Sequence, residues 1–329
     1  MTTIGFCSTS TPITAISPKR FERAKAFLKN KGIRLVAGSL SGKRDYYRSG
    51  SILDRANEVN QLIHNDEVDI IMATIGGTNT NAVLPYLDYE YLNQHPKTIV
   101  GYSDATALLL AVRTQAPNCR TLYGPALVAS LGEWPPFVNE SWTNFEKIVR
   151  TRPGEAVTVR APEYWDDEAI NWNDEAINWN DFERPKKQRP NQWHAIGETR
   201  LSVRLIGGNL DTIYGILASK YFPKLTFGDL LFIEDAEKDA ATVEKNFAMI
   251  RDAGAFDKVR GVILGKHALF DDLGTQRRPI DILLEVLNNQ RLSIIYDYDS
   301  CHTTPMMTTP LGAQAVIDAE KCTASFSDF

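Results

Sequence analysis

The chain has 329 residues, enough for two domains, and its 43% hydrophobic and 23% charged residues are typical of a globular protein with an ample core. Its formal net charge of −5 and the lack of a long basic cluster argue against nucleic acid or an anionic membrane surface as a partner. The longest fully apolar run, residues 107–112, is far too short to span a bilayer.

The amino-terminal residues and the cysteines indicate a compartment. Residues 1–7 lack a basic segment and lead directly into a strand-like run, so we expect no signal peptide. The four cysteines are scattered along the chain and form no C-x-x-C pair. This pattern favours a reducing cytoplasm and argues against a disulfide framework or a zinc site.

The first half alternates short apolar runs with amphipathic helical patterns. Strands are predicted at 3–7, 33–36, 68–74 and 98–102, and helices begin near residues 18, 52, 81 and 105. Alternating β and α elements with apolar strands are typical of a parallel sheet covered on both faces. We therefore expect residues 1–160 to form a doubly wound, Rossmann-like α/β domain.

Ser103 and Asp104 are the only residues between the predicted strand at 98–102 and the helix that begins at Ala105. A serine in so tight a turn points its hydroxyl over the sheet edge, beside a helix N-terminus where negative charge is stabilised. Small residues at Gly101 and Ala105 avoid collisions in such an elbow. The stretch predicts a nucleophile, although a serine that merely caps the helix also fits the pattern.

A second loop, residues 75–79, leaves the strand at 68–74 at the edge where sites form in parallel sheets. Its paired glycines, Gly76 and Gly77, allow close backbone approach and an exposed N–H, as an oxyanion hole requires. A plain glycine turn and a phosphate-binding loop are the alternatives. The second lacks a surrounding G-x-G-x-x-G or Walker pattern.

Residues 161–198 are polar and rich in Trp and Pro, unlike the segments on either side. They contain two adjacent copies of Asp-Glu-Ala-Ile-Asn-Trp-Asn, at 167–173 and 174–180. Two copies do not build a solenoid, so a small duplication tolerated in an exposed loop is the simplest account. We interpret the segment as an inter-domain linker that also acts as a lid.

Residues 199–329 return to strand and helix patterns. We expect a second α/β domain with a mixed sheet, and an active site between the two domains. Strands are predicted at 199–206, 230–233, 259–264 and 292–296, and helices open at 209, 240 and 280.

A serine nucleophile needs a base, and the base needs a group that orients it. Of the five histidines, His302 lies in a loop stiffened by two prolines and His267 follows a strand, so these two are the better candidates. Glu234, at the exit of an apolar strand, could orient the base or could be a solvated strand-end carboxylate. The residues alone leave these alternatives open.

Several motifs occur in a characteristic order between residues 3 and 318. They are Ile75-Gly-Gly-Thr, Gly101-Tyr-Ser-Asp, Leu205-Ile-Gly-Gly-Asn-Leu, Leu231-Phe-Ile-Glu-Asp, His302-Thr-Thr-Pro and Pro310-Leu-Gly. Together they resemble the LD-carboxypeptidase family of serine peptidases. The stretches 45–50 and 261–267 are more similar to its branch of microcin C self-immunity proteins than to its peptidoglycan enzymes.

The resemblance implies a catalytic triad of Ser103 as nucleophile, His302 as general base and Glu234 as the group that orients the imidazole. It also implies an oxyanion hole formed by the backbone N–H groups of Gly77 and Asp104. The reaction would pass through an acyl-enzyme that water then cleaves, and it would need no metal or cofactor.

The same resemblance implies residues that contact the substrate. Gly76 and Lys238 match the branch, whereas Asp211 stands where the branch often has Asn, so substrate preference could differ there. A lid tryptophan of the branch stacks on adenine. The duplication offers both Trp172 and Trp179 for this role; we prefer Trp172, and packing of both rings against protein surface is the alternative.

We expect a cytoplasmic serine hydrolase that cleaves the bond between an aminoacyl or peptidyl group and a nucleotide, giving self-immunity or detoxification. The partner is then a small molecule, and the family suggests a homodimer. A muropeptide LD-carboxypeptidase of cell-wall recycling is the near alternative. A catalytically silent nucleotide- or peptide-binding protein is the alternative from another class.

Overall fold

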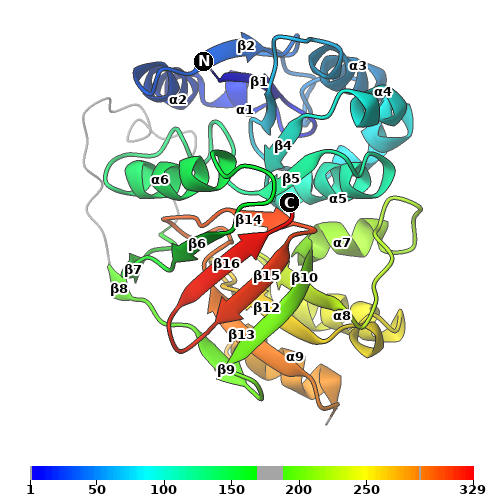
Figure 1. The fold of residues 1–329 in the computed structure, drawn as a ribbon, viewed down its shortest axis with the longest axis vertical. Coiled ribbons are helices and arrows are strands. Elements are labelled where there is room, and N and C mark those ends of the chain that lie inside the picture. Colours follow the sequence, from blue (N-terminus) through cyan, green and yellow to red (C-terminus); the bar gives the residue numbers. More distant parts are fainter. Residues whose placement is uncertain (1, 169–187, 289) are drawn as a thin grey trace.

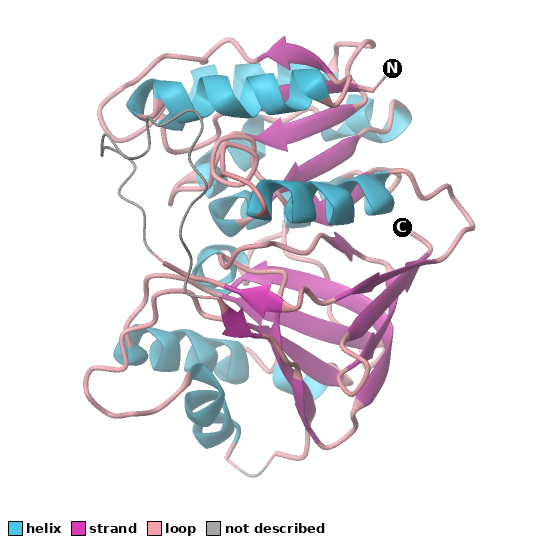
Figure 2. Ribbon diagram, turned by 90° about the vertical axis from the view of Figure 1, so that its left-hand side faces the viewer, coloured by secondary structure: helices cyan, strands magenta, loops and turns pink. Residues whose placement is uncertain are grey.

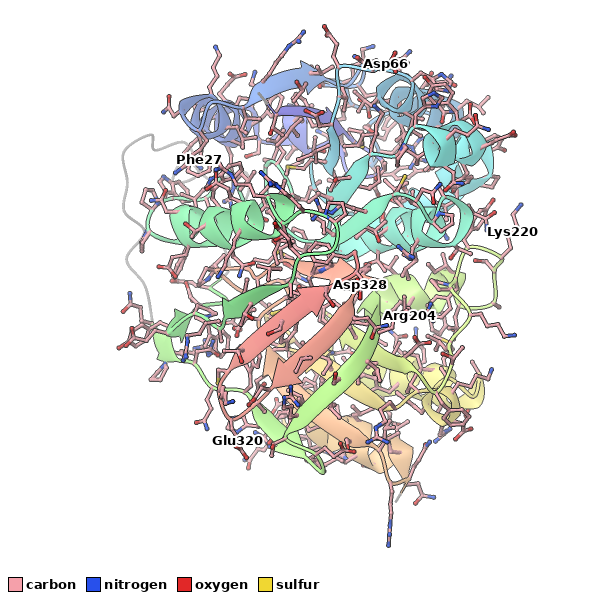
Figure 3. All side chains as sticks on the ribbon, viewed as in Figure 1. Phe27, Asp66, Arg204, Lys220, Glu320 and Asp328 are labelled. Atoms are coloured by element: carbon pink, nitrogen blue, oxygen red, sulfur yellow. The ribbon has the colours of Figure 1, made fainter. Side chains whose placement is uncertain are left out.

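The computed structural model describes residues 2–168, 188–288 and 290–329. Two sheets, one above the other in Figure 1, each carry their own helices, and the buried apolar side chains of both halves form one cluster. Charged side chains such as Asp66, Lys220 and Glu320 lie at the periphery (Figure 3). No helix in the described residues is long and apolar enough to cross a membrane.

The first sheet has six strands in the order β14–β5–β4–β3–β1–β2. The strands are β1 (Thr3–Cys7), β2 (Arg34–Ala37), β3 (Ile70–Ala73), β4 (Thr98–Gly101), β5 (Arg120–Tyr123) and β14 (Thr309–Leu311). All neighbours are parallel except β14, which pairs antiparallel with β5. Helices lie in front of and behind this sheet in Figure 2, so the predicted doubly wound architecture is confirmed.

The helices that accompany the first sheet follow its strands in the chain. They are α1 (Ile13–Ile16), α2 (Pro18–Asn30), α3 (Ile52–Ile63), α4 (Tyr89–Gln94), α5 (Thr106–Gln115) and α6 (Phe137–Val149), with 3₁₀ helices η1 (Thr80–Tyr86) and η2 (Ser103–Ala105). The Ser51 and Asp54 side chains form the capping box that opens α3. The single helix expected from residue 81 is instead η1 followed by α4, because Pro85 interrupts helical hydrogen bonding there.

The second sheet is mixed, with eight strands in the order β6–β16–β15–β10–β11–β12–β13–β9. Strands β10 to β13 are parallel neighbours, and the outer pairings are antiparallel. The strands are β6 (Val157–Arg160), β9 (His194–Ile196), β10 (Arg200–Asn209), β11 (Asp229–Glu234), β12 (Gly261–Gly265), β13 (Ser293–Tyr298), β15 (Gln314–Asp318) and β16 (Thr323–Ser327). The helices are α7 (Leu210–Ile216), α8 (Ala240–Asp252) and α9 (Pro279–Leu287), with the 3₁₀ helix η4 (Phe256–Lys258).

Strands are exchanged between the two halves of the sequence. β6 precedes residue 161 yet belongs to the second sheet, β14 lies near the carboxyl end yet belongs to the first, and β9 of the expected linker also joins the second sheet. A short antiparallel pair, β7 (Tyr164–Trp165) and β8 (Arg189–Pro190), stands at the base of the expected lid. The division of the chain at 1–160, 161–198 and 199–329 stays a prediction. Each sheet contains strands from more than one of these segments.

Candidate active site

Ser103 is separated from β4 by Tyr102 alone, and its backbone lies in the left-handed region at φ 59°. This conformation is unfavourable for a residue with a side chain, and such strain is found at functional turns. The turn is possible only because its neighbours are small: a Cβ added to Gly101 would lie 2.8 Å from the Ala105 Cβ and 3.0 Å from the Ala73 Cβ. The elbow predicted from the sequence is thus present.

The glycine loop that follows β3 lies against this elbow. A Cβ added to Gly76 would lie 2.6 Å from the Ser103 Cβ and 3.0 Å from the Asp104 backbone nitrogen, so the two backbones are in contact. The Asp104 carboxylate accepts hydrogen bonds from the backbone nitrogens of Asn79 (3.0 Å) and Thr80 (2.9 Å), which fixes the loop to the elbow. Gly76 therefore lies beside Ser103 and the Asp104 backbone, and Gly77 lines the same cavity as Ser103.

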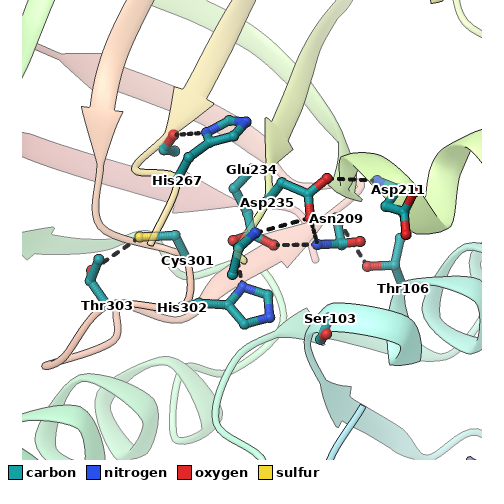
Figure 4. A network of polar contacts seen from close by, with 12 residues as sticks. Ser103, Thr106, Asn209, Asp211, Glu234, Asp235, His267, Cys301, His302 and Thr303 are labelled. Carbon is teal, nitrogen blue, oxygen red and sulfur yellow. Dashed lines mark hydrogen bonds and ion pairs between the residues drawn. The ribbon is translucent and has the colours of Figure 1, made fainter. Parts of the chain in front are cut away.

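His302 and Glu234 come from the second half of the chain. Glu234 is the last residue of β11 and is fully buried, and its Oε2 accepts a hydrogen bond from His302 Nδ1 at 2.7 Å (Figure 4). Because a carboxylate only accepts, the hydrogen lies on Nδ1 and leaves Nε2 of the neutral ring free to act as a base. The ring also packs edge-on against Tyr102, with 4.8 Å between the centroids.

Burial and the charges of the two partners act in opposite directions on the pKa values of His302 and Glu234, whose side chains are 19% and 0% exposed. Burial by itself would lower the pKa of His302, but the charge and hydrogen bond of Glu234, helped by Asp235 and Glu237, hold that pKa above its usual value. Burial by itself would raise the pKa of Glu234, but His302, with hydrogen bonds from Tyr123 and Asn209, holds it below its usual value. The geometry therefore supports an imidazolium that forms next to a carboxylate that stays ionised.

One cavity of about 360 Å³ brings the serine and the histidine together. Figure 4 shows Ser103 on the turn drawn in cyan and the His302 ring on the neighbouring orange loop. The structure records no hydrogen bond between this hydroxyl and this ring. Catalytic hydrogen bonds are often long without substrate and tighten when it binds. The predicted site residues that line the cavity are Gly76, Gly77, Ser103, Asp104, Asp211, Lys238 and His302.

Three polar residues that the sequence analysis did not assign complete the network. The Tyr123 hydroxyl donates to Glu234 Oε1 and accepts the Ser103 backbone N–H at 3.0 Å. Asn209 Nδ2 lies 3.2 Å from Glu234 Oε1 and 3.1 Å from Asp235 Oδ1. Asn209 and Asp235 lie inside motifs quoted in the sequence analysis. Tyr123 ends a strand of ordinary composition, so only the pairing of this strand with β4 could have indicated that Tyr123 belongs to the site.

Asp235 is a second buried carboxylate beside Glu234. Burial and the neighbouring Glu234 charge raise the pKa of Asp235 to about 7, against hydrogen bonds such as that from the Ala236 backbone. Its Oδ2 accepts the Asp211 backbone N–H at 3.1 Å, which ties the start of α7 to the end of β11. Asp235 thus shapes the cavity wall at the position where the two domains face each other.

The two histidine candidates differ in their surroundings. His267 Nδ1 lies 3.1 Å from the Gly265 carbonyl oxygen rather than against a carboxylate. Burial lowers the pKa of His267 to about 4, so this ring stays neutral at physiological pH. Of the two, His302 is the one that contacts Glu234 and lines the cavity with Ser103.

The predicted substrate contacts are only partly within the described residues. Trp172 and Trp179 lie outside them. Asp166, in the segment expected to act as a lid, is fixed to the histidine loop, because Asp166 and Thr304 exchange two backbone hydrogen bonds of 2.9 Å. Within residues 2–168, 188–288 and 290–329, no group of three or more His, Cys, Asp or Glu side chains is arranged to hold a metal ion.

Comparisons with known proteins decide the family. The family model described as the LD-carboxypeptidase N-terminal domain matches residues 4–124, and that of the C-terminal domain matches residues 202–317. The chain belongs to the LD-carboxypeptidase family, peptidase S66. This family consists of serine carboxypeptidase-type hydrolases, so the resemblance stated from the motifs is confirmed.

Two relatives are similar to this chain over nearly the whole length of both proteins. A Vibrio cholerae protein with a provisional carboxypeptidase name is 48% identical, covering 99% of this chain and 95% of that protein. The microcin C7 self-immunity protein MccF of Escherichia coli is 44% identical, covering 99% and 93%. MccF solved with aspartyl sulfamoyl adenosine superposes with a TM-score of 0.94, covering 100% of this chain and 96% of that one.

Proposed function

We propose that this protein is a serine hydrolase that cleaves the bond between an aminoacyl or peptidyl group and a nucleotide. The observation that carries this proposal is the chain of contacts from Glu234 through His302 to the cavity that contains Ser103. The strained elbow and the glycine loop beside it support the same reading. A strained nucleophile turn and a histidine held by a carboxylate are features of acyl-transfer enzymes rather than of proteins that only bind a ligand.

In this mechanism His302 Nε2 takes the proton from the Ser103 hydroxyl as its oxygen attacks the acyl carbon. The negative charge on the carbonyl oxygen is stabilised by the backbone N–H groups of Gly77 and Asp104. The imidazolium, held by Glu234, then gives the proton to the leaving nitrogen or oxygen of the nucleotide. Water, deprotonated by His302, cleaves the acyl-serine and restores the hydroxyl.

The substrate class follows from the relatives. MccF, at 44% identity, is named for self-immunity to microcin C7 and has been solved with aspartyl sulfamoyl adenosine and with glutamyl sulfamoyl guanosine. We extend the same class, an acyl group joined to a nucleoside, to this chain, with self-protection or detoxification as the result. Trp172, or in its place Trp179, would stack on the base, as the resemblance to the self-immunity branch implies.

The test compares aminoacyl sulfamoyl adenosines with a muropeptide tetrapeptide, using the wild type and Ser103→Ala. We expect release of the free amino acid from the adenosine compounds and at least a thousandfold loss in the variant. Cleavage of the muropeptide alone would instead assign the protein the function of a muropeptide carboxypeptidase in cell-wall recycling. Binding without cleavage of any of them would make it a silent binding protein.

We further propose that the enzyme works in the cytoplasm as a homodimer. All four cysteines are unpaired in the structure, which is the state a reducing compartment maintains. Sedimentation of the purified protein tests the dimer, and cell fractionation tests the compartment.

A further inference from the structure

Two cavities meet at His302. The first, described above, contains Ser103 and extends to Asp211 and Lys238. The second, of about 150 Å³, shares the His302 wall with it and extends towards the base of the lid at residues 166–168. In acyl transfer the general base returns its proton to the leaving group, so the leaving group lies on the histidine side. The acyl side chain then lies in the first cavity, which Asp211 and Lys238 also line.

The charges that line the first cavity are unusual for a site that would take an acidic acyl group. Among the described residues, Lys238 is the only lysine or arginine that lines the first cavity. Its Nζ lies 2.9 Å from Asp211 Oδ2, so its charge is already paired. The same cavity is lined by three further carboxyl groups, those of Asp104, Asp235 and Glu237, and Glu237 also lines the second cavity. A carboxylate brought to this wall would meet negative charge with no free cation to offset it.

Asp211 is held in place by its contacts, although its side chain is 36% exposed. It lies in the first turn of α7, and its Oδ1 accepts a hydrogen bond from Asn246 Nδ2 at 3.2 Å. Burial alone would raise the pKa of Asp211, but Lys238 and Asn246 hold it below its usual value. The carboxylate is therefore ionised at neutral pH, and the ion pair is a fixed feature of the wall.

We propose that Asp211, by pairing with Lys238, makes this site select acyl groups whose side chain carries no negative charge. The inference rests on the proposed function and names its substrate class more narrowly. Uncharged and cationic side chains are accepted, whereas aspartyl and glutamyl groups are disfavoured. Replacing the carboxylate by an amide of the same shape frees the Lys238 ammonium and reverses the preference.

The experiment measures kcat/KM for aspartyl and asparaginyl sulfamoyl adenosine, which differ only in the side-chain charge. We expect the wild type to favour the asparaginyl compound, and Asp211→Asn to shift the ratio roughly tenfold towards the aspartyl one. Asp211→Asn with Lys238→Met should lose that shift. Asp252→Asn, which removes the same charge at the far end of α8, is the matched control and should leave the ratio unchanged.

A wild type that favours the aspartyl compound, or a ratio unmoved by Asp211→Asn, overturns the inference while the proposed function stands. If neither compound is cleaved, the proposed function fails. Calorimetric Kd values for the two compounds on Ser103→Ala, with and without Asp211→Asn, then decide the inference separately. A shift of the Kd ratio supports it, and an unchanged ratio or no binding of either compound overturns it.

Discussion

Tyr123 joins the nucleophile turn to the acidic member of the candidate triad. Its hydroxyl donates to Glu234 Oε1 and accepts the backbone N–H of Ser103, so one side chain at the end of β5 contacts both halves of the site. Burial, followed by the adjacent Glu234 charge, raises the pKa of Tyr123 well above its usual value. The phenol thus stays protonated and always offers its hydrogen to the carboxylate.

Tyr123→Phe removes this donor with little change in shape. We expect kcat to fall about tenfold to a hundredfold with KM nearly unchanged, because a buried carboxylate loses one hydrogen bond, an effect of about 1–3 kcal/mol. Steady-state kinetics on the cleaved substrate measure the split. Tyr214→Phe, at an exposed tyrosine, is the control and should behave as wild type. A normal kcat for Tyr123→Phe would show that Tyr123 is only a packing residue.

The pH dependence of the reaction follows from the pKa of His302. Because Glu234 holds this pKa above its ordinary value of 6.5, the ring is protonated and inactive as a base at lower pH. We expect kcat/KM to rise with pH through a midpoint above 6.5. In Glu234→Gln the raising charge is lost while burial remains, so the midpoint should move down and kcat should fall. A midpoint that stays in place would contradict the assigned pairing.

Local patterns gave most of the architecture and part of the site. The strand before Ser103 and the tight turn after it are visible because only two residues separate an apolar run from a helical one. The capping box at Ser51 is equally local. The contact of Tyr123 with Glu234 spans 111 residues and joins two sheets, so no periodicity in either segment indicates it. The placement of β14 in the first sheet is hidden for the same reason.

Gly76 should tolerate no side chain. A Cβ there would lie 2.6 Å from the Ser103 Cβ, a distance at which one of the two backbones must move. We expect Gly76→Ala to lower kcat at least a hundredfold, since a displacement of about 1 Å at a reacting atom has effects of this size. Gly228→Ala is the matched control, because its Cβ would meet only Thr226 Oγ1, at 3.6 Å. Equal activity of the two variants would contradict the close approach of loop and elbow.

The buried ion pair of Lys266 and Asp299 lies where the segment that carries His302 meets the expected linker at residues 161–198. The two side chains are 5% and 0% exposed, and Asp299 Oδ2 also accepts hydrogen bonds from Asn191 Nδ2 (2.8 Å) and Trp193 Nε1 (2.7 Å). Asn191 and Trp193 belong to the expected linker and lid segment at 161–198, and Asp299 precedes His302 by three residues. Asp299 therefore fixes the end of this segment beside the candidate base.

Asp299→Asn leaves the Lys266 ammonium buried without its counter-charge. We expect the free energy of unfolding to fall by about 3–5 kcal/mol, the usual result of removing one partner of a buried pair. Urea unfolding measures this loss, and Asp252→Asn on the surface, where losses stay near 0.5 kcal/mol or below, is the control. Lys266→Met with Asp299→Leu removes both charges at once and should regain part of the stability. Equal stability of Asp299→Asn and wild type would mean that water already reaches the pair.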